Sequence, residues 1–106
     1  MLTEKEVTAE IVRSRDLHGP LSRDHGKVIK ILMREVLEAA QEEAEMSRLP
    51  RMSTTRHGTL LALRVELVQV VAVAVQWIAN IDNEREHEKL YEQANSGRDS
   101  AGSAVR

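Results

Sequence analysis

The stretch RVELVQVVAVAVQWIANI, residues 64–81, constrains the fold most, because it is apolar almost throughout and yet carries several polar side chains. At about 100° per residue on a helical wheel, its interrupting polar residues fall within roughly 80° of one another: Glu66, Gln69, Gln76 and Asn80. A helix with so wide an apolar surface is predicted to be buried against several neighbours, with its polar stripe facing inward. Because a bilayer span needs roughly 20 apolar residues, we interpret this broken stretch as a core helix.

The rest of the chain also favours helices, which are predicted over about residues 4–16, 24–47 and 58–94. Thr3 and Glu6 have the spacing of a capping box at the start of the first helix. Ser22 and Asp24 offer an N-cap for the second helix. The fold class is therefore predicted to be all-α, a helical bundle with long antiparallel helices.

Domain organisation follows from length and composition. At 106 residues the chain is predicted to form one helical domain over residues 1–94. Residues 95–106 are small and polar, which is typical of a flexible tail. Three helices cannot enclose a helix that is apolar nearly all round, so we expect subunit association to complete the core.

Charge and composition exclude several classes of function. The net charge is −2, and basic and acidic residues are mixed along the chain, so no footprint for a nucleic acid polymer is seen. The absence of cysteine excludes disulfides and thiolate metal sites and fits a reducing cytoplasm. The charged start MLTEKEVTAE has no apolar segment of a secretory signal. We therefore expect a cytoplasmic location and no membrane partner.

Carboxylates on two predicted helices indicate a metal site. Glu35, Glu38 and Glu42 line one edge of the second helix, and Glu66 with Gln69 one turn on begins the polar stripe of the third. Carboxylates that lie close together in a partly buried place repel one another, which is energetically unfavourable. A hard divalent cation would neutralise their charge. Magnesium suits oxygen ligands of this kind. Taken alone, the glutamates of the second helix also fit a solvated acidic face.

These residues resemble the motifs of the MazG-like, all-α nucleoside triphosphate pyrophosphohydrolases. The family signature is ExxE on one helix and ExxD on the next, and the matching segments are EVLE, residues 35–38, and ELVQ, residues 66–69. The turn HGPLSRDHG and the helix ELVQVVAVAVQWIANID are also similar to the family, and the resemblance covers about residues 8–85. Gln69 stands where the family usually has Asp, so a neutral amide replaces a charged ligand.

The resemblance implies a homodimer or homotetramer that hydrolyses a nucleoside triphosphate to a monophosphate and pyrophosphate, often to remove non-standard nucleotides. It implies Mg²⁺, or alternatively Mn²⁺, held by the residues at the four motif positions: the carboxylates of Glu35, Glu38 and Glu66, and the amide of Gln69. Glu38 or Glu42 is expected to act as the general base. The candidates for substrate binding are Lys30 and Arg56, which lie near the motifs in sequence, and Asn80 on the polar stripe.

Other interpretations remain open on the sequence. Gln69, Gln76 and Asn80 also fit a structural hydrogen-bond ladder between subunits. Trp77 fits a core residue better than a base-stacking surface, and His25 fits a capping or surface group better than a cleft residue. The alternative functions are a non-catalytic helical assembly and a nucleotide-binding sensor with an impaired metal site.

Overall fold

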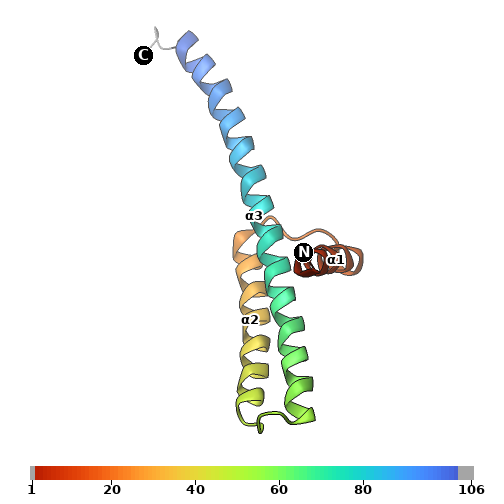
Figure 1. Cartoon of the computed structure of the whole chain (residues 1–106). Helices are drawn as coiled ribbons and strands as arrows, with labels where there is room; N and C mark the ends of the chain where they lie inside the picture. The colour runs from red at the N-terminus through yellow and green to blue at the C-terminus, as the bar shows by residue number, and fades with distance from the viewer. Residues whose placement is uncertain (1, 103–106) are drawn as a thin grey trace.

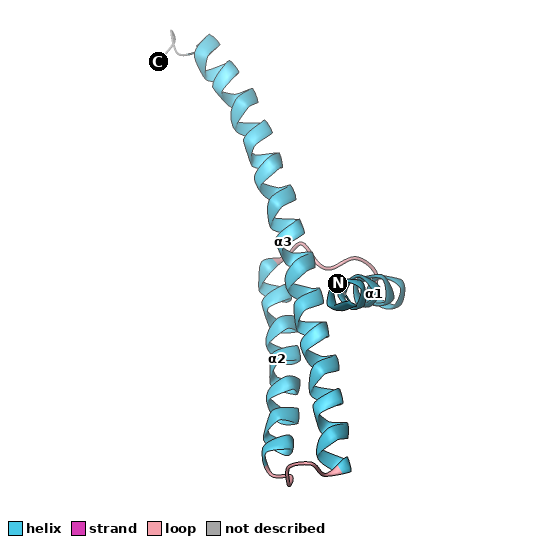
Figure 2. Cartoon of the chain, viewed as in Figure 1, coloured by secondary structure: helices cyan, strands magenta, loops and turns pink. Residues whose placement is uncertain are grey.

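The structure is a computed structural model that describes residues 2–102, and it confirms the all-α fold. Three helices follow one another along the chain (Figures 1 and 2): α1 Leu2–His18, α2 His25–Ser47 and α3 Thr54–Gly102. No strand occurs within residues 2–102. The helices begin and end within a few residues of the predicted positions, except that α3 starts earlier and runs further.

Helices α2 and α3 form a long antiparallel hairpin, and α1 crosses α3 steeply beside it (Figure 1). Asp24 caps α2 as predicted, because its side chain accepts hydrogen bonds from the backbone N–H of Gly26 at 2.9 Å and of Lys27 at 3.4 Å. Ser22 assists, since its hydroxyl oxygen accepts from the Asp24 N–H at 3.1 Å. This hairpin sets the register in which α2 and α3 face each other.

The contacts of the N-terminal helix differ from those that the sequence predicts. Thr3 lies inside the first turn of α1, and the Glu6 carboxylate pairs with the Arg64 guanidinium of α3 instead of closing a capping box. This ion pair lowers the pKa of Glu6. At the other end Gly19 has φ +78° and its N–H donates to the Arg15 carbonyl at 2.8 Å, which ends α1 in the left-handed conformation that glycine favours.

The last part of α3 is helical where a flexible tail is predicted. The helix continues to Gly102 instead of ending near residue 94, and residues 103–106 lie outside the described residues. Beyond the start of α2 the helix stands clear of the other two (Figure 1). Every side chain over residues 86–94 is exposed. The division into one domain and a flexible tail stays a prediction.

The core of a single chain is small. The described hydrophobic residues that are buried are Val7, Val28, Ala39 and Ala72. By contrast, α3 exposes Leu67, Val71, Ile78 and Ile81, which with Ala74 follow a spacing of four and three residues. Helix α2 exposes Ile29, Met33 and Val36 at the same spacing. Apolar residues in this alternation form the contact surface of coiled coils and helical bundles.

The long apolar helix also passes a test for membrane spans. Within the described part of the chain, α3 between Thr54 and Asn95 is long and apolar enough to cross a bilayer by length and composition alone. One such helix is weak evidence, because the central helix of a water-soluble bundle passes the same test. The polar stripe from Glu66 to Asn80 lies within this segment and would be costly in lipid.

We predict that the chain associates with itself through the exposed apolar stripes of α2 and α3. Sedimentation in detergent-free buffer should give the mass of a dimer or larger species. Val71→Glu should weaken association, because it places a charge in the middle of the stripe of α3. Leu17→Gln, which removes an exposed leucine on α1, is the matched control. A monomeric mass for the wild type, or partition of the protein into liposomes instead, would contradict this prediction.

Candidate functional site

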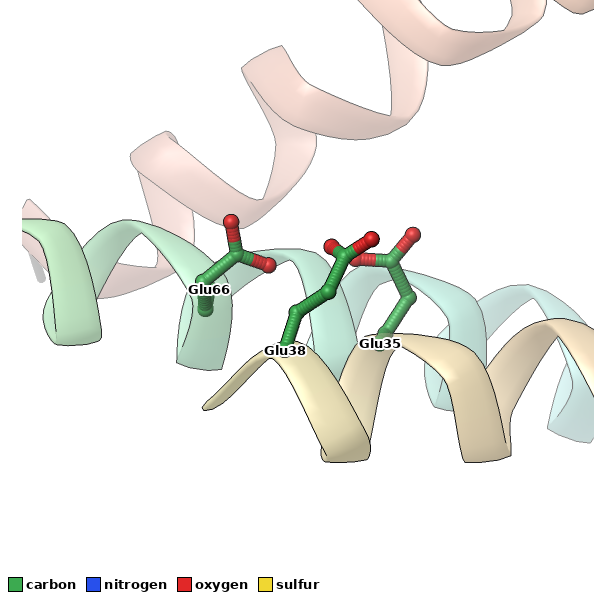
Figure 3. Close-up of side chains that lie close together, drawn as sticks. All are labelled: Glu35, Glu38 and Glu66. Atoms are coloured by element: carbon green, nitrogen blue, oxygen red, sulfur yellow. The ribbon is translucent and has the colours of Figure 1, made fainter. Parts of the chain in front are cut away.

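Three carboxylates converge where α2 faces α3. Glu35 and Glu38 lie one turn apart on α2, and Glu66 lies opposite them on α3 (Figure 3). One carboxylate oxygen from each residue lies within 4.8 Å of the others, and all three residues are half-buried. We call these residues the carboxylate cluster. The convergence that the sequence predicts for these residues is therefore present in a single chain.

The carboxylate cluster carries more negative charge than its surroundings favour. Partial burial, followed by the nearby Glu38 and Glu35, raises the pKa of Glu66 to about 7. Burial and the charge of Glu38 also raise the pKa of Glu35, although the Arg34 guanidinium acts in the opposite direction. The cluster therefore takes up a proton more readily than an ordinary carboxylate does, and Glu66 is about half protonated at pH 7. A divalent cation at the same place would neutralise the carboxylates without that proton.

Gln69 bridges the two helices beside the cluster. With its amide nitrogen turned toward the carboxylates, Gln69 donates to Glu66 Oε2 at 3.0 Å and to Glu35 Oε2 at 2.9 Å. A neutral amide thus stabilises the carboxylates in the absence of a cation. To act as a metal ligand, Gln69 would have to turn its carbonyl oxygen toward the cluster, so its predicted ligand role requires rotation of the amide.

The other predicted site residues lie outside the cluster. Glu42 is half-buried one turn beyond Glu38 and is not among the three converging carboxylates. Lys30 is exposed on α2. Arg56 lies near the turn between α2 and α3, about 15 Å from Glu66 along the helix axis. Within one chain the structure brings neither Lys30 nor Arg56 to the carboxylates.

Asn80 and Gln76 have other contacts. Asn80 lies about 21 Å along α3 from Glu66, and its Nδ2 donates to the Ser22 carbonyl at 3.2 Å, so it ties α3 to the loop before α2. Gln76 Nε2 donates to the Ala72 carbonyl of its own helix at 3.1 Å. The ladder between subunits therefore stays a prediction for these amides.

Trp77 and His25 form a cluster that the sequence did not indicate. Trp77 Nε1 donates to His25 Nδ1 at 2.9 Å, and His25 Nε2 lies 2.7 Å from Glu84 Oε2. Because Nδ1 accepts, the proton of a neutral imidazole lies on Nε2, where it can reach the Glu84 carboxylate. Trp77 is half-buried and His25 is exposed. These contacts fasten the first turn of α2 to α3.

A cavity of about 620 Å³ opens beside the carboxylate cluster. Its wall includes Glu35 and Gln69, so the cavity and the cluster are continuous. Helix α1 contributes Glu10, Arg13, Ser14 and His18 to the wall, and the α1–α2 loop contributes Leu21 and Ser22. Sequence reasoning missed the part played by α1, because no spacing within α1 shows where it crosses α3.

Comparisons with known proteins give no family assignment, since no family model, curated protein or solved structure matches this chain.

The raised pKa of Glu66 predicts a specific pH dependence of stability. The folded chain releases this proton near pH 7, whereas the unfolded chain releases it near 4.5. Without divalent cations the free energy of unfolding should therefore fall as the pH rises through this window. Thermal unfolding in EDTA from about pH 5 to about pH 8 measures the effect.

Two variants and the addition of Mg²⁺ make the thermal-unfolding test specific to Glu66. Glu66→Gln should flatten the fall in melting temperature, whereas Glu88→Gln, an exposed carboxylate far along α3, should leave it unchanged. Adding Mg²⁺ should restore stability at the alkaline end, because the cation binds the deprotonated cluster. Equal pH profiles for the wild type and Glu66→Gln would show that the carboxylates do not interact.

Proposed function

We propose that the protein is a magnesium-dependent nucleoside triphosphate pyrophosphohydrolase that acts as a cytoplasmic homo-oligomer. It would convert a ribonucleoside or deoxyribonucleoside triphosphate to the monophosphate and pyrophosphate, with removal of non-standard nucleotides as its role. The observation that carries the proposal is the convergence of Glu35, Glu38 and Glu66 from two helices beside a cavity of small-molecule size. The segments EVLE and ELVQ, which resemble the family signature, hold these residues.

The residues present fit a hard divalent cation. Carboxylate oxygens are the ligands that Mg²⁺ prefers, and it usually leaves positions for water and substrate phosphates. The pKa of Glu66, raised to about 7, supports the fit because burial and the neighbouring carboxylates disfavour its negative charge, which a cation would offset. When bound, Mg²⁺ would supply charge neutralisation for the phosphates and the leaving pyrophosphate. Mn²⁺ has similar ligand preferences.

The protein residues would divide the remaining work. Glu35 and Glu66 would hold the cation from opposite helices, and Gln69 would orient them. Hydrolysis adds water across the bridge between the α- and β-phosphates, so that one product gains the oxygen and a proton must be removed. Glu38 or Glu42 would accept this proton as general base. Glu38 lies in the cluster, whereas Glu42 lies about 6 Å further along α2.

Pyrophosphate release from a panel of standard and modified triphosphates tests the proposal. The wild type with Mg²⁺ should release pyrophosphate from at least one of them. Glu38→Gln should lower kcat by about 10²–10⁴-fold if Glu38 is the base, and Glu35→Gln should raise the Mg²⁺ concentration needed for half-maximal rate. Glu88→Gln, which makes the same charge change outside the site, is the control. No release from any triphosphate would overturn the enzymatic proposal.

A non-catalytic helical assembly or nucleotide sensor is the second candidate. Its support is the bridging of Glu35 and Glu66 by Gln69, which stabilises the cluster without a metal. The exposed apolar stripes of α2 and α3 favour assembly under either candidate. A sensor would bind the triphosphate with Mg²⁺ and return it unchanged. A simple assembly would bind neither, and replacing the cluster glutamates by glutamine would then stabilise it.

A further inference from the structure

The cavity beside the carboxylate cluster has the size and position of a nucleotide pocket. Its volume of about 620 Å³ lies within the range of small-molecule sites, about 300–1,000 Å³. All three helices and the α1–α2 loop contribute to its wall. Because Glu35 and Gln69 are part of this wall, a ligand in the cavity would reach the place where the cation is expected.

Two arginines bring positive charge to the cavity. Arg13 of α1 and Arg34 of α2 both line it. The pKa of Arg13 is raised chiefly by its hydrogen bond with Glu10, and the charge of Glu35 adds to the effect, so Arg13 and Glu35 interact across the cavity. Arg34 Nη2 lies 4.0 Å from Glu35 Oε1. Arg34 therefore lies beside the carboxylate cluster, and Arg13 lines the same cavity.

Both arginines are free enough to contact a ligand. Their side chains are 53% and 65% exposed, and each pairs only with a carboxylate on its own helix, Glu10 or Glu35. The Arg34 pair is weak, since its closest atoms are 4.0 Å apart, whereas Arg13 makes two hydrogen bonds with Glu10 that a phosphate would have to replace. Guanidinium groups bind phosphate oxygens in pairs of parallel hydrogen bonds. A triphosphate carried on a cation could therefore replace these carboxylates as the partner of the arginines.

Other residues of the wall suit the remainder of a nucleotide. Leu21, Ile31 and Val73 provide apolar surface, and Ser14 provides a hydroxyl group. Gln76 Nε2 already donates to the Ala72 carbonyl, which leaves the side-chain carbonyl oxygen to accept from a ligand. The wall of the cavity as a whole is more polar than apolar, which suits a charged and hydroxylated ligand.

We propose that this cavity binds the nucleoside triphosphate, with Arg13 and Arg34 contacting its phosphates. Helix α1 then supplies a phosphate-binding residue to a metal site built on α2 and α3. This assignment rests on the proposed function and moves the phosphate contacts from Lys30 and Arg56 to Arg13 and Arg34. In this assignment the two arginines would bind the phosphates, and the carboxylates of the cluster would hold the cation.

Calorimetry on the full chain with Mn²⁺ tests the assignment. The ligand is a triphosphate analogue with a methylene group between the α- and β-phosphates, which cannot be hydrolysed at that bridge. Arg13→Gln and Arg34→Gln should each weaken analogue binding by about tenfold or more, since each removes hydrogen bonds between charged groups. Arg15→Gln on α1 and Lys27→Gln, two turns before Arg34 on α2, are the matched controls. Neither residue lines the cavity, and neither change should weaken binding.

The affinity for Mn²⁺ without nucleotide should change in the opposite direction from the affinity for the analogue. Arg34→Gln should bind Mn²⁺ alone at least as tightly as the wild type, because it removes a positive charge beside Glu35. A variant that had merely lost its fold would bind both ligands more weakly. Arg13→Lys keeps the charge and should recover part of the affinity for the analogue.

Two results would overturn the assignment in different ways. Unchanged analogue binding by Arg13→Gln and Arg34→Gln, with weakened binding by Lys30→Gln or Arg56→Gln, would refute the cavity assignment and leave the proposed function standing. Failure of the wild type to bind the analogue with Mn²⁺ would refute both.

Discussion

Repulsion among three carboxylates held together by the α2–α3 hairpin is the constraint on which this account depends. The antiparallel packing places Glu66 opposite Glu35 and Glu38, with one oxygen of each within 4.8 Å of the others. The hydrogen bonds of Gln69 and the retained proton each relieve part of the repulsion. A divalent cation would relieve more, because it brings two positive charges to the same point. The same cluster therefore underlies both the local structure and the proposed chemistry.

The arrangement also explains why the hairpin is long and its core small. The polar stripe of α3 faces α2 and the loop before it, where Glu66, Gln69 and Asn80 make their contacts. The apolar residues on the outer side of α3 are then left without a partner inside the chain. Burying them against a second copy would stabilise the hairpin and, with it, the spacing of the carboxylates. The self-association that we predict would in this way be physically coupled to the site.

The sequence predicted what depends on periodicity and could not predict what depends on tertiary contacts. Helical spacing placed Glu66 and Gln69 on one stripe and Glu35 with Glu38 on one edge, and the structure brings these residues together. Helix α1 is joined to α3 by the pair between Glu6 and Arg64, which are far apart in the chain, so the sequence did not indicate that Arg13 lines the cavity. Lys30 and Arg56 lie near the motifs in sequence, which is why they were predicted to bind substrate. Within the folded chain, their helices place both away from the cluster.

The most direct test of the central claim is a titration of the Glu66 side-chain carboxyl carbon by NMR, with and without Mg²⁺. Without the metal, the account predicts a pKa of about 7. Saturating Mg²⁺ should lower that pKa, because the cation competes with the proton for the same oxygens. A pKa near the ordinary value of 4.5 that does not respond to Mg²⁺ would contradict the account, since the three carboxylates would then neither repel one another nor bind a cation.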